Sequence, residues 1–287
     1  RIVRIVRIVR IVRIVRIVQS PLISDMAKKT ILIAICLIVG FATTMVIQRP
    51  QRLMAPLRQV PFLRAIVRPN AAPIETAESQ MAIYGTKVRA RISDHFKLAG
   101  CKYPPDHLTM VVIKDTKELM VYGAAEDKKY KYICTYPVLG ASGVLGPKLR
   151  EGDYQVPEGL YELTLEPNTP YHLALRLNYP NQMDRARALA DGRDNPGSDI
   201  LIHGNIGSVG CMAMGDPASE DLFVMAYDTK TKPLPLIIAP VDWRDGKVAP
   251  KDDLAPLWLP ALYDEIKTEL VKLPLRDQKN KRIIYVP

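Results

Sequence analysis

Residues 198–216 read SDILIHGNIGSVGCMAMGD, and this stretch carries most of what the sequence says about fold and chemistry. Its apolar start predicts a short strand over 200–203 that ends in His203-Gly204. A glycine-containing loop follows, and the SVGC run at 208–211 leads toward a predicted helix. Glycine lets the backbone turn freely, so we expect the loop to fold back and bring Cys211 within reach of His203.

A cysteine and a histidine placed in this way suit nucleophilic catalysis. A free thiol is a weak nucleophile, and an adjacent base or cation turns it into the reactive thiolate. His203 is the candidate base. Gly210 leaves room for two backbone N–H groups to point at one oxygen, as an oxyanion hole requires. A helix that starts soon after Cys211 would favour the thiolate further through its dipole.

Structural explanations compete with the catalytic one. Cys211 could be a small buried apolar residue, and His203 a core histidine bonded to backbone. A zinc site would have to draw on His172, Cys101 and Cys134, which show no ligand spacing, so we expect no metal and no cofactor. The last two cysteines could form a disulfide in an oxidising compartment or stay separate thiols. The residues around Cys211 favour catalysis.

Outward from this stretch the chain alternates short strands with few helices. Apolar residues at three- and four-residue spacing predict a helix over 77–99, followed by Gly100. Strand-like patterns predict a hairpin of 108–113 and 118–122, then strands at 130–139, 160–165, 171–177 and 234–239. Further helices are expected over 217–228 and 258–273. The predicted fold class is mainly β with flanking helices, α+β.

The N-terminal third has a different composition. Residues 1–18 repeat Arg-Ile-Val six times, a period that matches neither a helix face nor a strand face, and we interpret 1–25 as low-complexity sequence that is not native. Two lysines and an uncharged run predict a signal-anchor at 26–48, with 30–48 crossing the inner membrane. Its end shows no clear cleavage site, which favours retention. Residues 49–75 read as a linker rich in proline and arginine.

The rest of the chain is assigned to three parts: a helical lead-in at 76–104, a catalytic domain at 105–250 and a C-terminal helical extension at 251–287. The formal net charge of +10 belongs to the N-terminus, because residues 70–287 hold 27 of the 40 cationic and 29 of the 30 acidic residues. This folded part is close to neutral. We therefore expect no nucleic-acid binding.

The site stretch resembles the signature of the YkuD-type L,D-transpeptidase catalytic domain, in which His-Gly precedes a Ser/Thr-x-Gly-Cys loop. With Ala213, Met214 and Asp216 it resembles the YafK-like branch in particular. The resemblance continues at 146–148, 152–161 and 179–181 and covers about residues 105–240. Two departures are visible: Val209 stands where the commoner pattern has a second histidine, and the gap between His203 and Cys211 is shorter. The first departure leaves the acyl acceptor open.

The resemblance implies roles for individual residues. Cys211 attacks the carbonyl of the L-centred residue, meso-diaminopimelate in Gram-negative walls, in a stem tetrapeptide and expels terminal D-alanine. His203 takes the thiol proton and later activates an amine or water. The N–H groups of Gly210 and Cys211 would hold the oxyanion, and the carbonyl of Gly204 would orient the imidazole. Ser208 would shape the loop by hydrogen bonding.

Two more polar residues are weaker candidates. Asn178 and Arg185 could bind amides or carboxylates of the substrate, although solvated surface residues of these types are common. The Gly152-Asp153 pair is expected to form a turn rather than a substrate contact.

The function implied is a cysteine L,D-transpeptidase that works through a thioester on peptidoglycan stem peptides, in cell-wall organisation and cell shape. It would form crosslinks or attach a partner such as a wall-attached lipoprotein, at the periplasmic face of the inner membrane or in the periplasm if the anchor is cleaved. One alternative is an amidase or endopeptidase that passes the same acyl-enzyme to water. Another is a non-catalytic wall-binding module.

Overall fold

The computed structural model describes residues 74–250 and 255–276. The predicted low-complexity segment, the signal-anchor and nearly all of the linker lie outside these residues. Residues 74–287 form one compact unit, and the description below concerns this unit alone. None of the helices within the described ranges is long and apolar enough to cross a membrane.

One eight-stranded sheet runs through the unit, in the order β3-β2-β1-β8-β4-β5-β6-β7. The strands are β1 (His107–Ile113), β2 (Glu118–Ala124), β3 (Lys131–Pro137), β4 (Gly159–Thr169), β5 (His172–Leu177), β6 (Leu201–His203), β7 (Met212–Ala213) and β8 (Leu234–Ala239). Most neighbours pair antiparallel, while β1 with β8 and β6 with β7 pair parallel. The late strand β8 therefore joins the N-terminal hairpin to the site half of the sheet.

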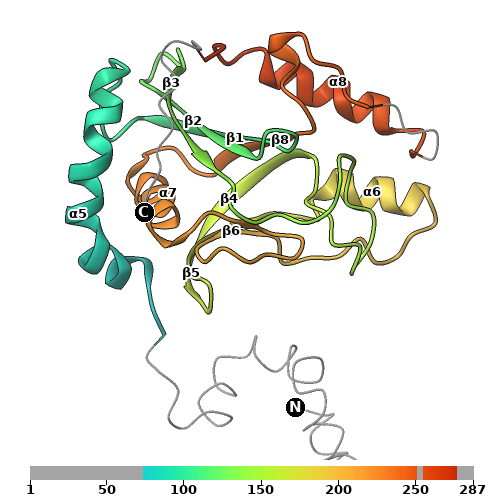
Figure 1. Cartoon of the computed structure of the whole chain (residues 1–287), viewed down its shortest axis with the longest axis horizontal. Helices are drawn as coiled ribbons and strands as arrows, with labels where there is room; N and C mark the ends of the chain where they lie inside the picture. Colours follow the sequence, from blue (N-terminus) through green and yellow to red (C-terminus); the bar gives the residue numbers. More distant parts are fainter. Residues whose placement is uncertain (1–73, 251–254, 277–287) are drawn as a thin grey trace, which may run out of the picture. The chain divides into compact units, whose positions relative to one another are not determined.

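The described residues contain four α-helices and one short 3₁₀-helix. They are α5 (Ala77–Leu98), α6 (Gln182–Ala190), α7 (Asp216–Asp228), α8 (Leu259–Leu270) and η1 (Trp243–Asp245). Figure 1 shows α5 beside α7, on the other side of the sheet from α8. Each face of the sheet is thus covered over part of its area.

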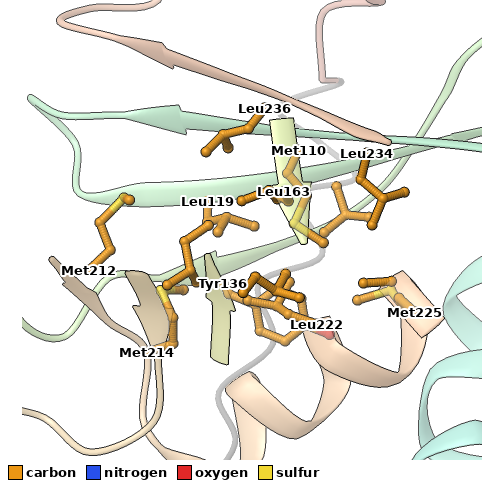
Figure 2. Packing of buried hydrophobic residues seen from close by; sticks show 14 of the residues in the cluster. Met110, Leu119, Tyr136, Leu163, Met212, Met214, Leu222, Met225, Leu234 and Leu236 are labelled. Carbon is orange, nitrogen blue, oxygen red and sulfur yellow. The ribbon is translucent and has the colours of Figure 1, made fainter. Parts of the chain in front are cut away.

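Two apolar cores explain why β1 and β2 are almost continuously apolar. Met110 and Val112 belong to the larger core under α5 and α7, while Val111 and Ile113 belong to a second core under α8. Successive side chains of a strand point to opposite faces, so a strand covered on both faces loses the polar half of its pattern. Figure 2 shows the larger core, where Met212 and Met214 from the site segment pack with Leu119.

The mainly β, α+β fold class predicted from the sequence is confirmed. The predicted hairpin is β1 and β2, which pair antiparallel, and the strand predicted over 234–239 is β8. The helices predicted over 77–99, 217–228 and 258–273 are α5, α7 and α8. The prediction missed α6 and β7. The domain boundaries stay predictions, although α5 and α8 pack on the same sheet as the 105–250 segment.

The helix that follows Cys211 begins close to its predicted start at 217, because α7 starts at Asp216. The short strand β7 lies between Cys211 and this helix. Met212 lies in the apolar core, and Met212 and Ala213 pair parallel with β6. The dipole of α7 therefore does not start at the thiol.

Candidate active site

His203 and Cys211 lie on one face of the β6–β7 pair. His203 is paired with Ala213, and Cys211 is one residue before the pair of Ile202 and Met212. The side chains of that last pair are in the core. By strand alternation, His203 and Cys211 face the opposite side of the sheet, diagonally across two neighbouring strands.

The imidazole of His203 is held by its neighbour in the chain. Its Nδ1 lies 2.5 Å from the carbonyl oxygen of Gly204, the contact expected from the sequence. Because a carbonyl only accepts, Nδ1 carries the proton, and Nε2 is left as the basic nitrogen. His203 is 2% exposed, and the ring of Tyr171 covers it at a centroid distance of 4.9 Å. Burial lowers the pKa of His203, opposed by the Gly204 hydrogen bond, so the ring is neutral at pH 7.

The thiol of Cys211 is hydrogen-bonded to two backbone groups. Its Sγ accepts the backbone N–H of Leu201 at 3.3 Å and donates to the carbonyl of Asp199 at 3.5 Å. It makes no hydrogen bond to His203. Burial raises the pKa of the thiol, and the Leu201 N–H only partly opposes this. Cys211 is therefore a protonated thiol at neutral pH and needs a base when it attacks.

Gly204 occupies a position with no room for a side chain. An added Cβ would lie 2.5 Å from Asp216 Oδ1, 2.8 Å from His172 Cβ and 2.9 Å from the carbonyl oxygen of Tyr171. Asp216, the first residue of α7, accepts the N–H of Asn205 at 2.7 Å through the same oxygen. The start of α7 thus holds the residues that follow His203, and glycine is what lets them approach so closely.

Of the two expected oxyanion donors, Gly210 has its N–H bonded within the protein. The N–H of Gly210 donates to Ser142 Oγ at 2.8 Å, and this hydroxyl donates to the carbonyl of Tyr154 at 2.7 Å. The N–H of Cys211 makes no hydrogen bond with any described residue. Gly210 has φ of +80°, a conformation that favours glycine. The oxyanion role of the two N–H groups stays a prediction, and Ser142 would have to release Gly210 before both could act.

The Ser208 side chain does not make the loop hydrogen bond that the resemblance implies. Its Oγ is buried and has no hydrogen-bond partner among the described residues, so it does not tie the loop together. The hydroxyl that contacts this loop in the structure is that of Ser142, which accepts the Gly210 N–H. Ser142 is 68 positions away in the chain, and no local pattern indicates that it meets Gly210.

The two weaker candidates are not joined to the pair. Asn178 accepts the N–H of Glu162 at 2.9 Å and so extends the pairing of β4 with β5. Arg185 is exposed on α6, where its N–H donates to the Asn181 carbonyl at 3.2 Å, and its side chain has no hydrogen bond or ion pair among the described residues. Asp153 behaves as predicted for a turn residue: its carboxylate accepts the N–H groups at 149, 150 and 155. Substrate contacts by Asn178 and Arg185 stay predictions.

A cation that the sequence did not single out lies on the same face as Cys211. Arg176 on β5 is paired with Leu201, whose N–H reaches the thiol. The signal was the alternation of β5, where Leu173, Leu175 and Leu177 are buried and Arg176 is not. That pattern predicts on which face of the sheet Arg176 lies. The neighbouring strand could not be inferred, because residues 178–200 separate β5 from β6.

The structure describes two further cysteines, Cys101 and Cys134. They form no disulfide with each other, so that alternative is not realised in the structure. Within the described ranges, histidines, cysteines and carboxylates form no group of three that could hold a metal ion.

A cavity of about 180 Å³ lies next to the loop that carries Ser142. Val138, Val156 and Met212 provide apolar walls, and Lys114 and Lys117 reach its rim. Lys114 is neutralised by Glu158 at 3.0 Å. Two of its lining residues are linked to the site segment: Ser142 accepts the Gly210 N–H, and Met212 follows Cys211 in the chain.

Comparison with known proteins confirms the class that the motif indicates: the chain is similar to the L,D-transpeptidases. One relative is YafK of Escherichia coli K12, which is named as a candidate L,D-transpeptidase. It is 32% identical over 115 residues, which cover 39% of this chain and 44% of the relative. The chain thus spans less than half the length of the curated relative that it matches. No family model matches the sequence.

Solved structures give weaker matches. The helical cell shape determining protein Pgp2 of Campylobacter jejuni is 25% identical, with a TM-score of 0.37, over 55% of this chain and 57% of that one. L,D-transpeptidase 1 of Mycobacterium tuberculosis is 16% identical, with a TM-score of 0.28, over 47% and 62%. TM-scores this low carry no conclusion about function.

Proposed function

We propose that this protein is a cysteine acyltransferase of the L,D-transpeptidase type that acts on peptidoglycan stem peptides. One observation carries the proposal. His203 has its Nδ1 fixed on the Gly204 carbonyl and its Nε2 available, on the same face of adjacent strands as Cys211. A neutral, oriented imidazole beside a protonated thiol is what general-base activation of a cysteine needs.

In the proposed reaction the Cys211 sulfur attacks the carbonyl carbon of the residue before the terminal D-alanine. The thiol proton passes to Nε2 of His203, and the Cys211 N–H donates to the carbonyl oxygen as it becomes an oxyanion. Collapse breaks the amide C–N bond, and the imidazolium gives its proton to the departing amine. A thioester on Cys211 results. An amine or a water then attacks the thioester, His203 takes the attacker's proton, and the C–S bond breaks to return the thiol.

The setting of this reaction follows from the predicted N-terminal segments. We propose the periplasmic side of the inner membrane, with residues 30–48 as the anchor, or the periplasm if the anchor is removed. The acceptor would be an amine of a second stem peptide or of a wall-attached lipoprotein. Water is the other acceptor and would make the same site an amidase.

Intact mass spectrometry of the full chain tests the proposal. The protein is exposed to a tetrapeptide-containing muropeptide or to a carbapenem, beside Cys211→Ala. We expect a covalent adduct that the variant lacks. Faster decay of the adduct with added amine would indicate a transferase, and decay in water alone a hydrolase. A folded protein with a reactive Cys211 but without any adduct would contradict the enzyme proposal and favour a binding module.

A matched control separates Cys211 from the other thiols. The chain also holds Cys36, Cys101 and Cys134, any of which could be labelled without a catalytic role. Cys101 is half-buried, like Cys211, and burial also raises the pKa of its thiol. Cys101→Ser should therefore leave the adduct unchanged. Loss of the adduct in both variants would show that labelling does not depend on the proposed site.

A further inference from the structure

The outer face of the sheet beside Cys211 carries an arginine that the proposed mechanism does not use. Arg176 lies on β5, paired with Thr164 of β4 on one side and Leu201 of β6 on the other. The Leu201 N–H donates to Cys211 Sγ at 3.3 Å. Arg176 is thus one strand away from the nucleophile, and its side chain is 37% exposed.

One edge of the Arg176 guanidinium is fixed by a strand neighbour. Nε donates to Glu166 Oε2 at 2.9 Å, and Nη2 lies 2.9 Å from the same oxygen. Glu166 belongs to β4, where it is paired with Ala174, so both partners of this contact come from regular strands. A planar guanidinium held along one edge presents its other edge in a defined direction.

That other edge is occupied by Asp199, which also contacts the thiol. Nη1 of Arg176 donates to the carboxylate of Asp199, while the backbone carbonyl of Asp199 accepts the Cys211 thiol at 3.5 Å. The Asp199 side chain is 80% exposed. Its φ is +61°, a conformation that is uncommon for a residue with a side chain. An exposed carboxylate thus covers a well-held cation next to the nucleophile.

The charges of Arg176 and Asp199 both affect the pKa of the Cys211 thiol. Burial is the main cause of the raised pKa of Cys211, and the Leu201 N–H lowers this pKa; Asp199 then raises it and Arg176 lowers it, each by a smaller effect. A ligand carboxylate that displaced Asp199 would take over its contact with Nη1, and the exposed Asp199 side chain would turn to water. A ligand carboxylate could therefore take this place without leaving Arg176 unpaired, and it would be held within a short distance of the thiol.

We propose that Arg176 is a binding site for a carboxylate of the substrate and that the Asp199 carboxylate occupies this site when substrate is absent. The inference rests on the proposed function for the identity of the substrate, but not for the anion site itself. In a stem tetrapeptide two carboxylates lie near the scissile bond: that of the departing D-alanine and that of the diaminopimelate side chain. Both offer the same chemistry to the guanidinium.

Alkylation of Cys211 tests the anion site without any enzymatic reaction. Iodoacetate carries a carboxylate and iodoacetamide is its neutral analogue, so the ratio of their rates at Cys211 reports attraction of an anion. We expect Arg176→Met to lower this ratio about tenfold, the factor of one charge-assisted hydrogen bond. Asp199→Asn should raise it, because the competing carboxylate is gone.

Two further variants serve as controls for the alkylation ratio. Lys87→Met removes one positive charge from an exposed position on α5 and should leave the ratio within about twofold, since distant surface charges are screened. Arg176→Lys keeps the charge but loses the planar guanidinium, so its alkylation ratio should lie between those of the wild type and Arg176→Met. Equal ratios in the wild type and Arg176→Met would overturn the proposal. Because both reagents meet the same protein, a folding defect would change both rates and not their ratio.

Substrate analogues then distinguish the two sources. Acylation of Cys211 is measured with tetrapeptides whose terminal D-alanine is free or amidated, and with diaminopimelate free or amidated at its side-chain carboxylate. Arg176→Met should slow only donors that carry the recognised carboxylate, by roughly 10- to 100-fold. An equal loss with every donor would contradict the proposal. If the wild type is acylated by none of them while iodoacetate selectivity holds, the proposed function fails and the anion site stands.

Discussion

At the scale of single residues, Gly204 gives the sharpest test of the site geometry. An added Cβ would meet Asp216 Oδ1 at 2.5 Å, so Gly204→Ala should displace the carbonyl that orients His203. We expect a loss of stability of about 1–3 kcal/mol, as for overpacking of a dense region, together with slower acylation of Cys211. Gly207→Ala is the matched control, because its Cβ would meet nothing within 4 Å. Equal behaviour of the two variants in thermal melts and acylation would contradict this geometry.

The pH dependence of the reaction also depends on single residues. Burial lowers the pKa of His203, so the neutral base persists as the pH falls below the ordinary value of about 6.5. The acid limb of Cys211 acylation should therefore have its midpoint below pH 6.5, measured as acylation rate against pH. His203→Ala should lose this limb and most of the rate. A midpoint above 6.5 would mean that the imidazole is not held in its buried, neutral form.

At the scale of elements, α5 is joined to α7 by a buried ion pair. Arg91 of α5 donates from Nε to Asp221 of α7 at 2.8 Å, and Tyr136 of β3 donates to the same carboxylate at 3.0 Å. The Asp221 side chain is 0% exposed. Helix α7 also starts at Asp216, which accepts the N–H of Asn205. The ion pair therefore helps to fix the helix that holds the segment after His203.

Arg91→Met should destabilise the protein by about 3–5 kcal/mol, because it leaves a buried carboxylate without its cation. Burial raises the pKa of Asp221 and Arg91 opposes this, so the pKa rises further in the variant. The loss should be smaller at acid pH, where the carboxyl is protonated, and larger as the pH rises. Urea unfolding at several pH values measures it. Lys272→Met removes an exposed partner of Glu269 and should cost no more than about 1 kcal/mol; a similar loss in both variants would contradict the argument.

Which elements could be predicted depended on how each buries its residues. Strongly periodic segments such as α5 and β8 follow from spacing, because their buried positions recur along the chain. Helix α6 buries Ala188 alone and has no apolar period, although Asn181 and Asp184 form a capping box that could have announced it. Strand β7 has two residues, too few for any period. Contacts such as Ser142 with Gly210 join distant segments and depend on the register of the whole sheet.

At the scale of the whole molecule, α8 should unfold together with the sheet rather than as a separate extension. Leu262, Ile266 and Leu270 fill the second core against β1 and β8. In addition, Tyr263 donates to the buried Glu158 at 2.9 Å. These contacts bury one face of the same strands whose other face belongs to the larger core. A domain that ended near residue 250 would expose that face to water.

Ile266→Ala therefore tests the unity of the fold. Its side chain is 0% exposed, and truncation of such a residue costs about 2–5 kcal/mol. The two tryptophans, Trp243 and Trp258, both border the second core, so their fluorescence reports the packing around α8, while far-UV circular dichroism reports the secondary structure of the whole unit. We expect both signals to shift to lower temperature by the same amount, in one coincident transition. A fluorescence transition that precedes an unshifted circular dichroism transition would instead make α8 an independent appendage and leave the site supported by α5 and α7 alone.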